Sequence, residues 1–123
     1  MQSFAVSILL FCSILLQGSA QPSLVHVITV DGTINPASAD YIHDEIQRAS
    51  ESGAECLVIR LDTPGGLLKS TRVIVSDILT APLPVIVYVT PAGAQSASAG
   101  VFVTLAAHIA VMTPGTNMGA AHP

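Results

Sequence analysis

The chain has 123 residues, of which half are apolar and only 10% are charged, and its formal net charge is −4 at pH 7. About a quarter of the residues of a soluble domain are usually charged, so the low value indicates strands buried on both faces, or a surface that another segment completes. The sequence has only four lysine and arginine residues. It therefore disfavours a nucleic-acid partner, because binding to a phosphate backbone depends on clustered basic side chains.

The first 20 residues have the pattern of a targeting segment. An almost continuous apolar run spans residues 4–16, and small residues at 18–20 form a cleavage site before Gln21 and Pro22. The run is shorter than the ~20 residues that a helix needs to span a bilayer. We therefore predict a signal peptide over residues 1–20, which exports the chain, and one domain over residues 21–123.

The mature chain then keeps Cys56 as its one cysteine, so it cannot form an internal disulfide. Cys56 lies in an apolar strand pattern, which predicts a buried and inert thiol. His26 alternates with apolar residues in another strand pattern, which predicts a structural histidine rather than a catalytic one.

The first half of the domain predicts a strand, a helix and a second strand. Residues 24–30 are rich in β-branched side chains and end at a turn signal. Asn35 is then a helix N-cap followed by proline at the first helical position, and Gly53 is placed to end that helix. The next strand covers residues 56–61. In the helix that begins after Asn35, apolar residues recur with helical spacing at Ile42, Ile46 and Ala49.

The second half continues the alternation. A helix is predicted from Leu67 to the prolines at 82 and 84, followed by a strand over residues 85–89, a helix ending near Ala107 and a strand over residues 108–112. Residues 113–117 are predicted to be a loop. Strands that alternate with helices of this length indicate a mostly parallel α/β sheet. The helix that is predicted to begin at Leu67 has an apolar stripe formed by Leu67, Leu68, Thr71, Ile74, Val75, Ile78 and Leu79.

A run of small residues at 90–100 separates the third strand from its helix. A strand that breaks into Gly, Ala and Ser before a helix can hold a serine at a sharp turn, where backbone amides approach the substrate closely. Ser98 is then a nucleophile at the helix start, with the amide of Ala99 directed at the developing oxyanion. The alternative is a structural role, in which Ser96 or Ser98 caps the first turn of the helix.

The loop after the second strand reads Asp62-Thr-Pro-Gly-Gly66. Sites in parallel α/β sheets gather at the carboxyl ends of the strands, where this loop, the serine run and a third loop over residues 113–118 are expected. Two glycines before a helix expose amides that suit a negative charge, although a tight turn would also require glycine. The loop matches no nucleotide-binding fingerprint, and the four histidines lack metal-ligand spacing. We therefore expect no cofactor and no metal.

Three segments resemble successive blocks of the NfeD group, which are membrane-anchored serine proteases of the ClpP class, also called stomatin operon partner proteins. The segments cover residues 59–66, 94–100 and 114–123, and the resemblance extends over essentially the whole mature chain. It implies the ClpP/crotonase-like fold, an α/β spiral of β-β-α units with a mostly parallel sheet. This chain would then hold the incomplete amino-terminal part of that domain.

The resemblance also implies a site. Ser98 matches the nucleophile of the group, and the backbone amides of Gly65, Gly66 and Ala99 match its oxyanion hole. NfeD-type enzymes resemble Ser-Lys proteases, in which a lysine a few tens of residues after the serine takes its proton, provided that burial lowers the pKa of that lysine. The one lysine here, Lys69, precedes the serine. We therefore expect the general base to lie beyond residue 123.

His122 is the alternative base. ClpP has a histidine close to a proline in this region, but His122 directly precedes Pro123, and NfeD-type sequences carry a similar Ala-His-Pro without using it as the base. We therefore favour a structural or substrate-lining role for His122. No carboxylate follows Ser98 in the sequence, so a Ser-His-Asp triad in that chain order cannot be completed within it.

Three functions remain open from the sequence. The favoured one is an exported, membrane-associated serine endopeptidase on the periplasmic or extracytoplasmic face, a homo-oligomer that cuts apolar peptide segments of stomatin-like membrane proteins. The second is a non-catalytic scaffold partner of stomatin-like membrane proteins. The third is a crotonase-type acyl-CoA enzyme, which the export signal disfavours. Without a base, we expect the chain as given to be inactive, and its apolar character predicts poor solubility on its own.

Overall fold

A computed structural model of the chain describes residues 18–122. Residues 1–17, which make up most of the predicted signal peptide, and Pro123 lie outside the described residues. Within the described part of the chain, no helix is both long and apolar enough to cross a membrane.

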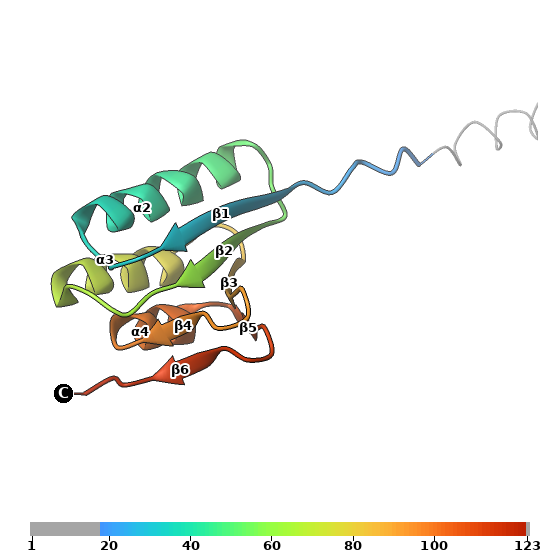
Figure 1. The fold of residues 1–123 in the computed structure, drawn as a ribbon. Coiled ribbons are helices and arrows are strands. Elements are labelled where there is room, and N and C mark those ends of the chain that lie inside the picture. The colour runs from blue at the N-terminus through green and yellow to red at the C-terminus, as the bar shows by residue number, and fades with distance from the viewer. Residues whose placement is uncertain (1–17, 123) are drawn as a thin grey trace, which may run out of the picture.

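The main sheet has four parallel strands in the order β1, β2, β3 and β5. Each lies within one residue of the predicted bounds, so the prediction of a mostly parallel α/β sheet is confirmed. In Figure 1 the arrows of β1 and β2 point to the same side of the molecule, and the loops that follow them gather there. The strands are β1 (Val25–Asp31), β2 (Cys56–Asp62), β3 (Val85–Val89) and β5 (Ile109–Met112).

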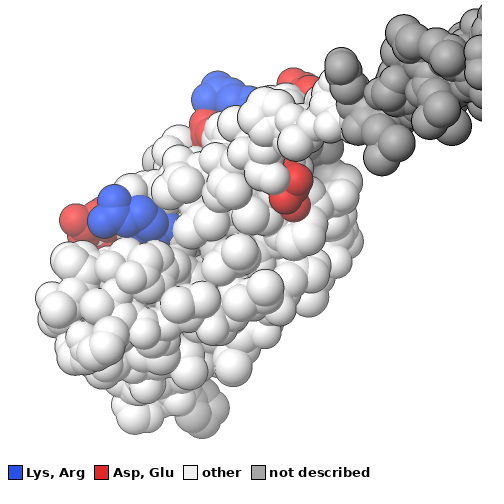
Figure 2. Space-filling view, turned by 90° about the vertical axis from the view of Figure 1, so that its right-hand side faces the viewer, with Lys and Arg blue, Asp and Glu red and all other residues white. Residues whose placement is uncertain are grey.

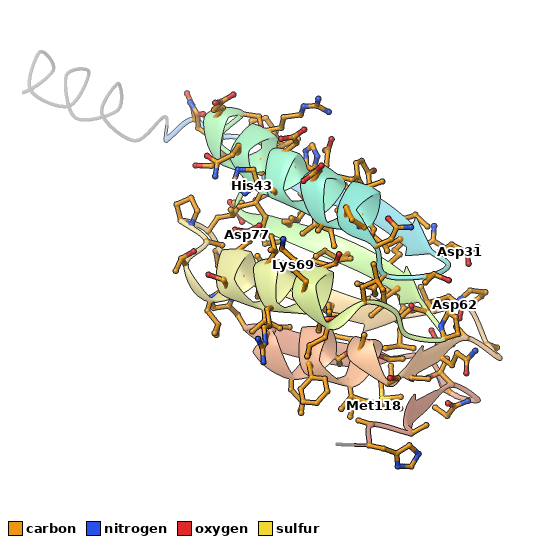
Figure 3. All side chains as sticks on the ribbon, turned by 90° about the vertical axis from the view of Figure 1, so that its left-hand side faces the viewer. Asp31, His43, Asp62, Lys69, Asp77 and Met118 are labelled. Atoms are coloured by element: carbon orange, nitrogen blue, oxygen red, sulfur yellow. The ribbon has the colours of Figure 1, made fainter. Side chains whose placement is uncertain are left out.

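Three helices lie side by side over one face of this sheet, as Figure 3 shows. They are α2 (Pro36–Glu51), α3 (Leu68–Leu79) and α4 (Ala99–Ala106). The predicted N-cap of α2 is confirmed, because Asn35 Oδ1 accepts a hydrogen bond of 2.9 Å from the amide of Ser38. Gly53 follows the C-cap residue of α2 with a φ of +72°, which ends the helix as predicted.

The core lies between the helices and the sheet. Alternate residues of each central strand point into it, which is why the buried positions of β2 and β3 recur every second residue. Each fully buried Ile or Leu contributes roughly 1.5–3 kcal/mol relative to an exposed one. The largest side chains that are at most 2% exposed are Ile34, Ile42, Ile46, Leu57, Ile59, Leu61, Ile74 and Ile78.

Polar side chains tie α2 to its neighbours. His26 Nε2 lies 2.6 Å from Glu45 Oε2, and Arg48 also pairs with Glu45, so His26 joins β1 to α2, as a structural histidine would. His43 is exposed, and its Nδ1 lies 3.2 Å from Asp77 Oδ2 on α3. Both residues are labelled in Figure 3. Cys56 is half-buried rather than buried, because it lies at the first position of β2.

The sequence did not predict a second, smaller sheet. It consists of β4 (Gln95–Ala97) and β6 (Asn117–Gly119), which pair in parallel. The predicted loop over 113–117 therefore runs into a strand, and the small-residue run contains one. The residues of β4 carry no β-branched or aromatic side chains, so this strand depends on its pairing with β6 and with Thr63.

The predicted apolar stripe of α3 is only partly buried. Thr71, Ile74 and Ile78 face the core, whereas Leu68 and Leu79 are 62% and 64% exposed. The latter two line a groove of about 760 Å³ between α3 and α4, together with Phe102 and Leu105. Figure 2 shows another side of the molecule, on which the few charged side chains lie over its upper half. The exposed leucines of the groove show that apolar surface is uncovered, as the low charge fraction led us to expect.

Candidate functional site

Ser98 has a strained backbone at the point where β4 ends and α4 begins. Its φ of +52° and ψ of −112° fall outside the regions that side chains other than glycine usually occupy. Such a conformation costs about 1–3 kcal/mol and is kept only where neighbouring contacts enforce it. Strained residues of this kind cluster at active sites, where they present a side chain in a fixed direction.

The neighbouring contacts come from both sides of Ser98. Its amide donates a hydrogen bond of 2.8 Å to the carbonyl of Gly119 on β6. Directly before it, β4 is fixed by pairing with β6 and by a bridge between Ser96 and Thr63. Beneath this turn, the buried hydroxyls of Ser96 and Thr104 lie 2.7 Å apart and satisfy each other.

The hydroxyl of Ser98 is not used to cap α4. Ser98 occupies the N-cap position, yet no capping hydrogen bond of its side chain is recorded in the described part of the chain. The hydroxyl of Ser96 pairs with Thr104 instead of the helix amides. The structural alternative, in which Ser96 or Ser98 caps the helix, is therefore wrong.

The glycine loop at residues 63–66 lies against Ser98. A methyl group built on Gly65 would come within 2.8 Å of Ser98 Cβ and 3.2 Å of its Oγ. Gly65 also has a φ of +120°, which favours glycine for a second reason. Gly66 lies against another segment, because a methyl group there would come within 2.0 Å of the carbonyl oxygen of Ile34. The two loops that the sequence singled out therefore lie in contact.

The amides of this region differ in what they bind. The Gly65 amide donates to Thr63 Oγ1 at 3.1 Å, and the Ser98 amide donates to Gly119. For the amides of Gly66 and Ala99, no acceptor is recorded within residues 18–122. Ala99 is the first residue of α4, where amides have no partner inside the helix. Within the described residues, these two amides are therefore left without a recorded hydrogen bond.

The possible bases within the sequence lie elsewhere. Lys69 is exposed on α3 and is labelled in Figure 3 on the outer side of that helix. His122 is exposed near the end of the described chain, and no hydrogen bond between it and Ser98 is recorded there. The part of the chain that the structure describes also contains no cluster of His, Cys, Asp or Glu side chains that could hold a metal ion.

Hydroxyl groups gather where β3 and β5 end. Thr113 Oγ1 lies 3.0 Å from Tyr88 Oη and 3.0 Å from Thr90 Oγ1. The hydrogen bond from Thr113 lowers the pKa of Tyr88, and Thr90 adds to this effect. This cluster orders the start of the loop that leads through residues 113–116 to β6, and so supports the strand that holds the Ser98 amide.

Sequence reasoning missed one residue that organises the site, Thr63. It was treated only as a member of the glycine loop, yet it is fully buried and bonds both to Gly65 and to β4. A signal was present, because Ser and Thr hydroxyls often accept a hydrogen bond from the amide two residues later. The order Thr63, Pro64, Gly65 fits that pattern.

Comparison with known proteins gives related sequences and structures. Membrane-bound protease PH1510 of Pyrococcus horikoshii is 40% identical over 101 residues, which cover 82% of this chain and 23% of that protein. The 1510-N membrane-bound stomatin-specific protease, solved with a serine replaced by alanine, has a TM-score of 0.82 and 38% identity over 84% of this chain and 50% of that one. Solved with a lysine replaced by alanine and with a substrate peptide, it has a TM-score of 0.80 and 40% identity, over 82% and 46% of the two chains.

ClpP1 from Listeria monocytogenes has the same fold, with a TM-score of 0.69 at 24% identity over 79% of this chain and 56% of that one. The expectation of a ClpP-like α/β fold is therefore confirmed. The chain spans about a quarter of PH1510 and about half of the 1510-N domain. Residues 24–123 match the family described as NfeD1b, N-terminal domain. The chain belongs to the NfeD1b N-terminal domain family.

Proposed function

We propose that this chain is the amino-terminal part of a serine endopeptidase in which Ser98 is the nucleophile. The observation that carries the proposal is the strained Ser98, whose hydroxyl is free of the helix and lies against a glycine loop. A nucleophile in acyl transfer needs a fixed hydroxyl and nearby donors for the oxyanion. The relationship to a membrane-bound protease supports the same reaction class.

The oxyanion would be bound by the amides of Gly66 and Ala99. Gly66 follows Gly65, Ala99 follows Ser98, and Gly65 lies in contact with Ser98. Neither the Gly66 amide nor the Ala99 amide has a recorded acceptor among the described residues. The Gly65 amide is engaged by Thr63. We therefore assign to Gly65 the role of making room for Ser98, and narrow the predicted set of oxyanion donors to Gly66 and Ala99.

The general base would be a lysine outside the 123 residues, forming a Ser-Lys dyad. Lys69 is exposed on α3, whereas a lysine base must be buried enough for its pKa to fall toward neutrality. The solved relative in which a lysine is replaced by alanine, with a substrate peptide bound, is consistent with such a base. His122 would line the substrate path.

The proposed substrates are apolar peptide segments of stomatin-like membrane proteins. The solved relative is described as stomatin-specific, and PH1510 as membrane-bound. In this proposal residues 1–20 are a signal peptide, residues 21–123 begin the protease domain, and the enzyme is a homo-oligomer at the extracytoplasmic face of a membrane. A scaffold that binds the same partners without cutting them is the competing function.

The test uses the full-length protein and a peptide from a stomatin-like protein. Ser98→Ala should lower the cleavage rate by at least about 10³-fold, since removal of a nucleophile abolishes the covalent step. Ser76→Ala, the same change at an exposed serine of α3, is the control and should cleave at the wild-type rate. A Ser98→Ala protein that cleaves normally would refute the proposal. Peptide binding without cleavage by the wild type would favour the scaffold.

A further inference from the structure

Thr63 connects the two elements that carry the proposed oxyanion donors. It has no exposed surface and lies directly after β2. Its amide donates to the carbonyl of Gln95 at 2.7 Å, and its carbonyl accepts from the amide of Ala97 at 3.0 Å. The backbone of Thr63 is therefore fixed to β4, the strand that leads into Ser98.

The hydroxyl of Thr63 holds both polar groups of Gly65. It accepts from the Gly65 amide at 3.1 Å and donates to the Gly65 carbonyl oxygen at 3.2 Å, which one hydroxyl can do because it is both a donor and an acceptor. The same carbonyl oxygen accepts a bond of 2.8 Å from the amide of Ile34. Two donors thus fix the direction of the Gly65 carbonyl.

That carbonyl determines where the Gly66 amide points. The Gly65 carbonyl and the Gly66 N–H belong to one planar trans peptide unit, so they point in opposite directions. The carbonyl is directed toward Ile34 and the Thr63 hydroxyl. The Gly66 N–H is therefore directed away from Ile34, on the side of the peptide unit that remains open.

The methyl group of Thr63 contacts the second donor element. A methyl group built on Gly100 would come within 2.6 Å of Thr63 Cγ2, so the threonine methyl lies directly against the first turn of α4. Gly100 follows Ala99, whose amide is the other proposed donor. One buried side chain thus touches the glycine loop with its hydroxyl and the helix start with its methyl group.

We propose that Thr63 is a positioning residue, which sets the direction of the Gly66 N–H relative to Ser98 and to the Ala99 N–H. This inference rests on the proposed function for its effect on the reaction. Its structural part, the control of the Gly66 peptide unit, stands independently of any activity. Removal of the hydroxyl should therefore affect the transition state more than the binding of the peptide.

The experiment separates the two groups of Thr63 in the full-length protein. Thr63→Val keeps a methyl group against Gly100 and loses the hydroxyl, whereas Thr63→Ser keeps the hydroxyl. We expect Thr63→Val to lower kcat by about 10-fold or more with little change in KM, because a misdirected oxyanion donor costs less than the roughly 10²- to 10³-fold of a deleted one. Thr63→Ser should keep kcat close to that of the wild type.

Thr71→Val is the matched control. Thr71 is also buried, and its hydroxyl also bonds to a backbone group, the carbonyl of Leu67 at 2.8 Å. The Thr71→Val variant loses a threonine hydroxyl of the same kind, but this hydroxyl makes no bond to Gly65. The kcat of the variant should therefore stay at the wild-type value. A wild-type kcat in Thr63→Val would overturn the proposal, as would equal losses in Thr63→Val and Thr71→Val. If Thr63→Val does not fold, a loss of kcat in folded Thr63→Ser would overturn it.

Hydrogen exchange measured by mass spectrometry on the peptide segment over residues 62–67 gives a readout that needs no catalysis. The Gly65 amide loses its acceptor in Thr63→Val, so this segment should exchange faster than in the wild type and in Thr71→Val. Unchanged exchange would overturn the positioning role. A wild-type protein that cleaves no peptide would instead refute the proposed function, while the exchange result would still decide the role of Thr63.

Discussion

Gly65 lies in contact with Ser98, so closely that a methyl group on Gly65 would come within 2.8 Å of Ser98 Cβ. Carbon atoms that are not bonded to each other do not approach so closely. The glycine loop and the serine turn are therefore matched in shape, and a side chain at Gly65 must displace one of them. The predictions below follow from this contact and from three other features of the fold.

Gly65→Ala should lower the rate of peptide cleavage strongly and the free energy of unfolding only moderately. The positive φ alone costs about 1–2 kcal/mol for a residue with a side chain, and the displaced serine should lower peptide cleavage by about 10²-fold. Gly93→Ala is the control, because Gly93 also has a positive φ, of +89°, but has no atom within 4 Å of the added methyl group. Thermal unfolding and cleavage rates of the full-length variants measure both effects. Equal activity in the two variants would contradict the contact.

Gly66→Ala should act on folding itself. The added methyl group would meet the Ile34 carbonyl oxygen at 2.0 Å. Because the clashing atoms are backbone atoms of Ile34, no side chain can move aside to relieve the clash. We expect a loss of at least about 3 kcal/mol in the free energy of unfolding, the upper end of what overpacking usually costs. Gly119→Ala, which places its methyl group in open space, should unfold like the wild type. A wild-type melting temperature for Gly66→Ala would show that the two segments are not in contact.

Glu45 should make stability depend on pH. Its hydrogen bond to His26, with a further contribution from Arg48, holds the Glu45 pKa below its ordinary value of 4.5. A carboxyl group with a lowered folded pKa stabilises the fold above its unfolded pKa, and that stability is lost as the pH falls through the folded value. The free energy of unfolding should therefore decrease as the pH drops below about 4.5.

Glu45→Gln tests this assignment. The variant should lose about 1.5–3 kcal/mol at neutral pH, since hydrogen bonds to charged groups are worth that much, and its stability should fall less steeply below pH 4.5. Glu51→Gln makes the same change on an exposed part of α2 and should follow the wild-type curve. Denaturant unfolding at a series of pH values gives the comparison. If the free energy of unfolding falls with pH equally steeply in the wild type and in Glu45→Gln, Glu45 is not the source of the pH dependence.

The exposed groove between α3 and α4 should limit the solubility of the 123-residue chain. Leu105 is 68% exposed in this groove, and large exposed apolar patches promote association. Leu105→Lys should reduce light scattering of the purified chain without changing its melting temperature. Leu24→Lys, at a leucine that is 46% exposed outside the groove, is the control and should have a smaller effect. Equal improvement from both variants would argue against the groove as the cause.

The strands of the main sheet could be predicted from sequence because each is a mostly apolar run that contains β-branched residues. The sheet of β4 and β6 could not, since Gln95–Ala97 and Asn117–Gly119 are three residues each, carry no β-branched or aromatic side chain, and pair only through contacts far apart in the chain. The periodicity of α3 identified Thr71, Ile74 and Ile78 as residues that face the core, but it missed the buried Ser70. It could not show that Leu68 and Leu79 are exposed within residues 18–122, because periodicity carries no information on what lies opposite a side chain.

The position of the site followed from the rule that parallel strands end at one edge, which brought the glycine loop and Ser98 together. The direction of each amide did not follow from sequence. Gly65 and Gly66 are the same residue type, yet one amide is bound by Thr63 and the other has no recorded acceptor among residues 18–122. The difference has two causes: the Thr63 hydroxyl accepts from the Gly65 amide, and the bonds from Ile34 and Thr63 to the Gly65 carbonyl direct the Gly66 N–H to the opposite side of that peptide unit.

The most direct test of a nucleophilic Ser98 is to treat the full-length protein with a fluorophosphonate and map the modified residue by mass spectrometry. Attack by Ser98 Oγ on phosphorus releases fluoride and leaves a stable adduct, so the account predicts one modified peptide that contains Ser98. That adduct should be absent from Ser98→Ala, and peptide cleavage should stop as it forms. Cleavage that continues while Ser98 stays unmodified, or that stops with the adduct on another residue, would contradict the account.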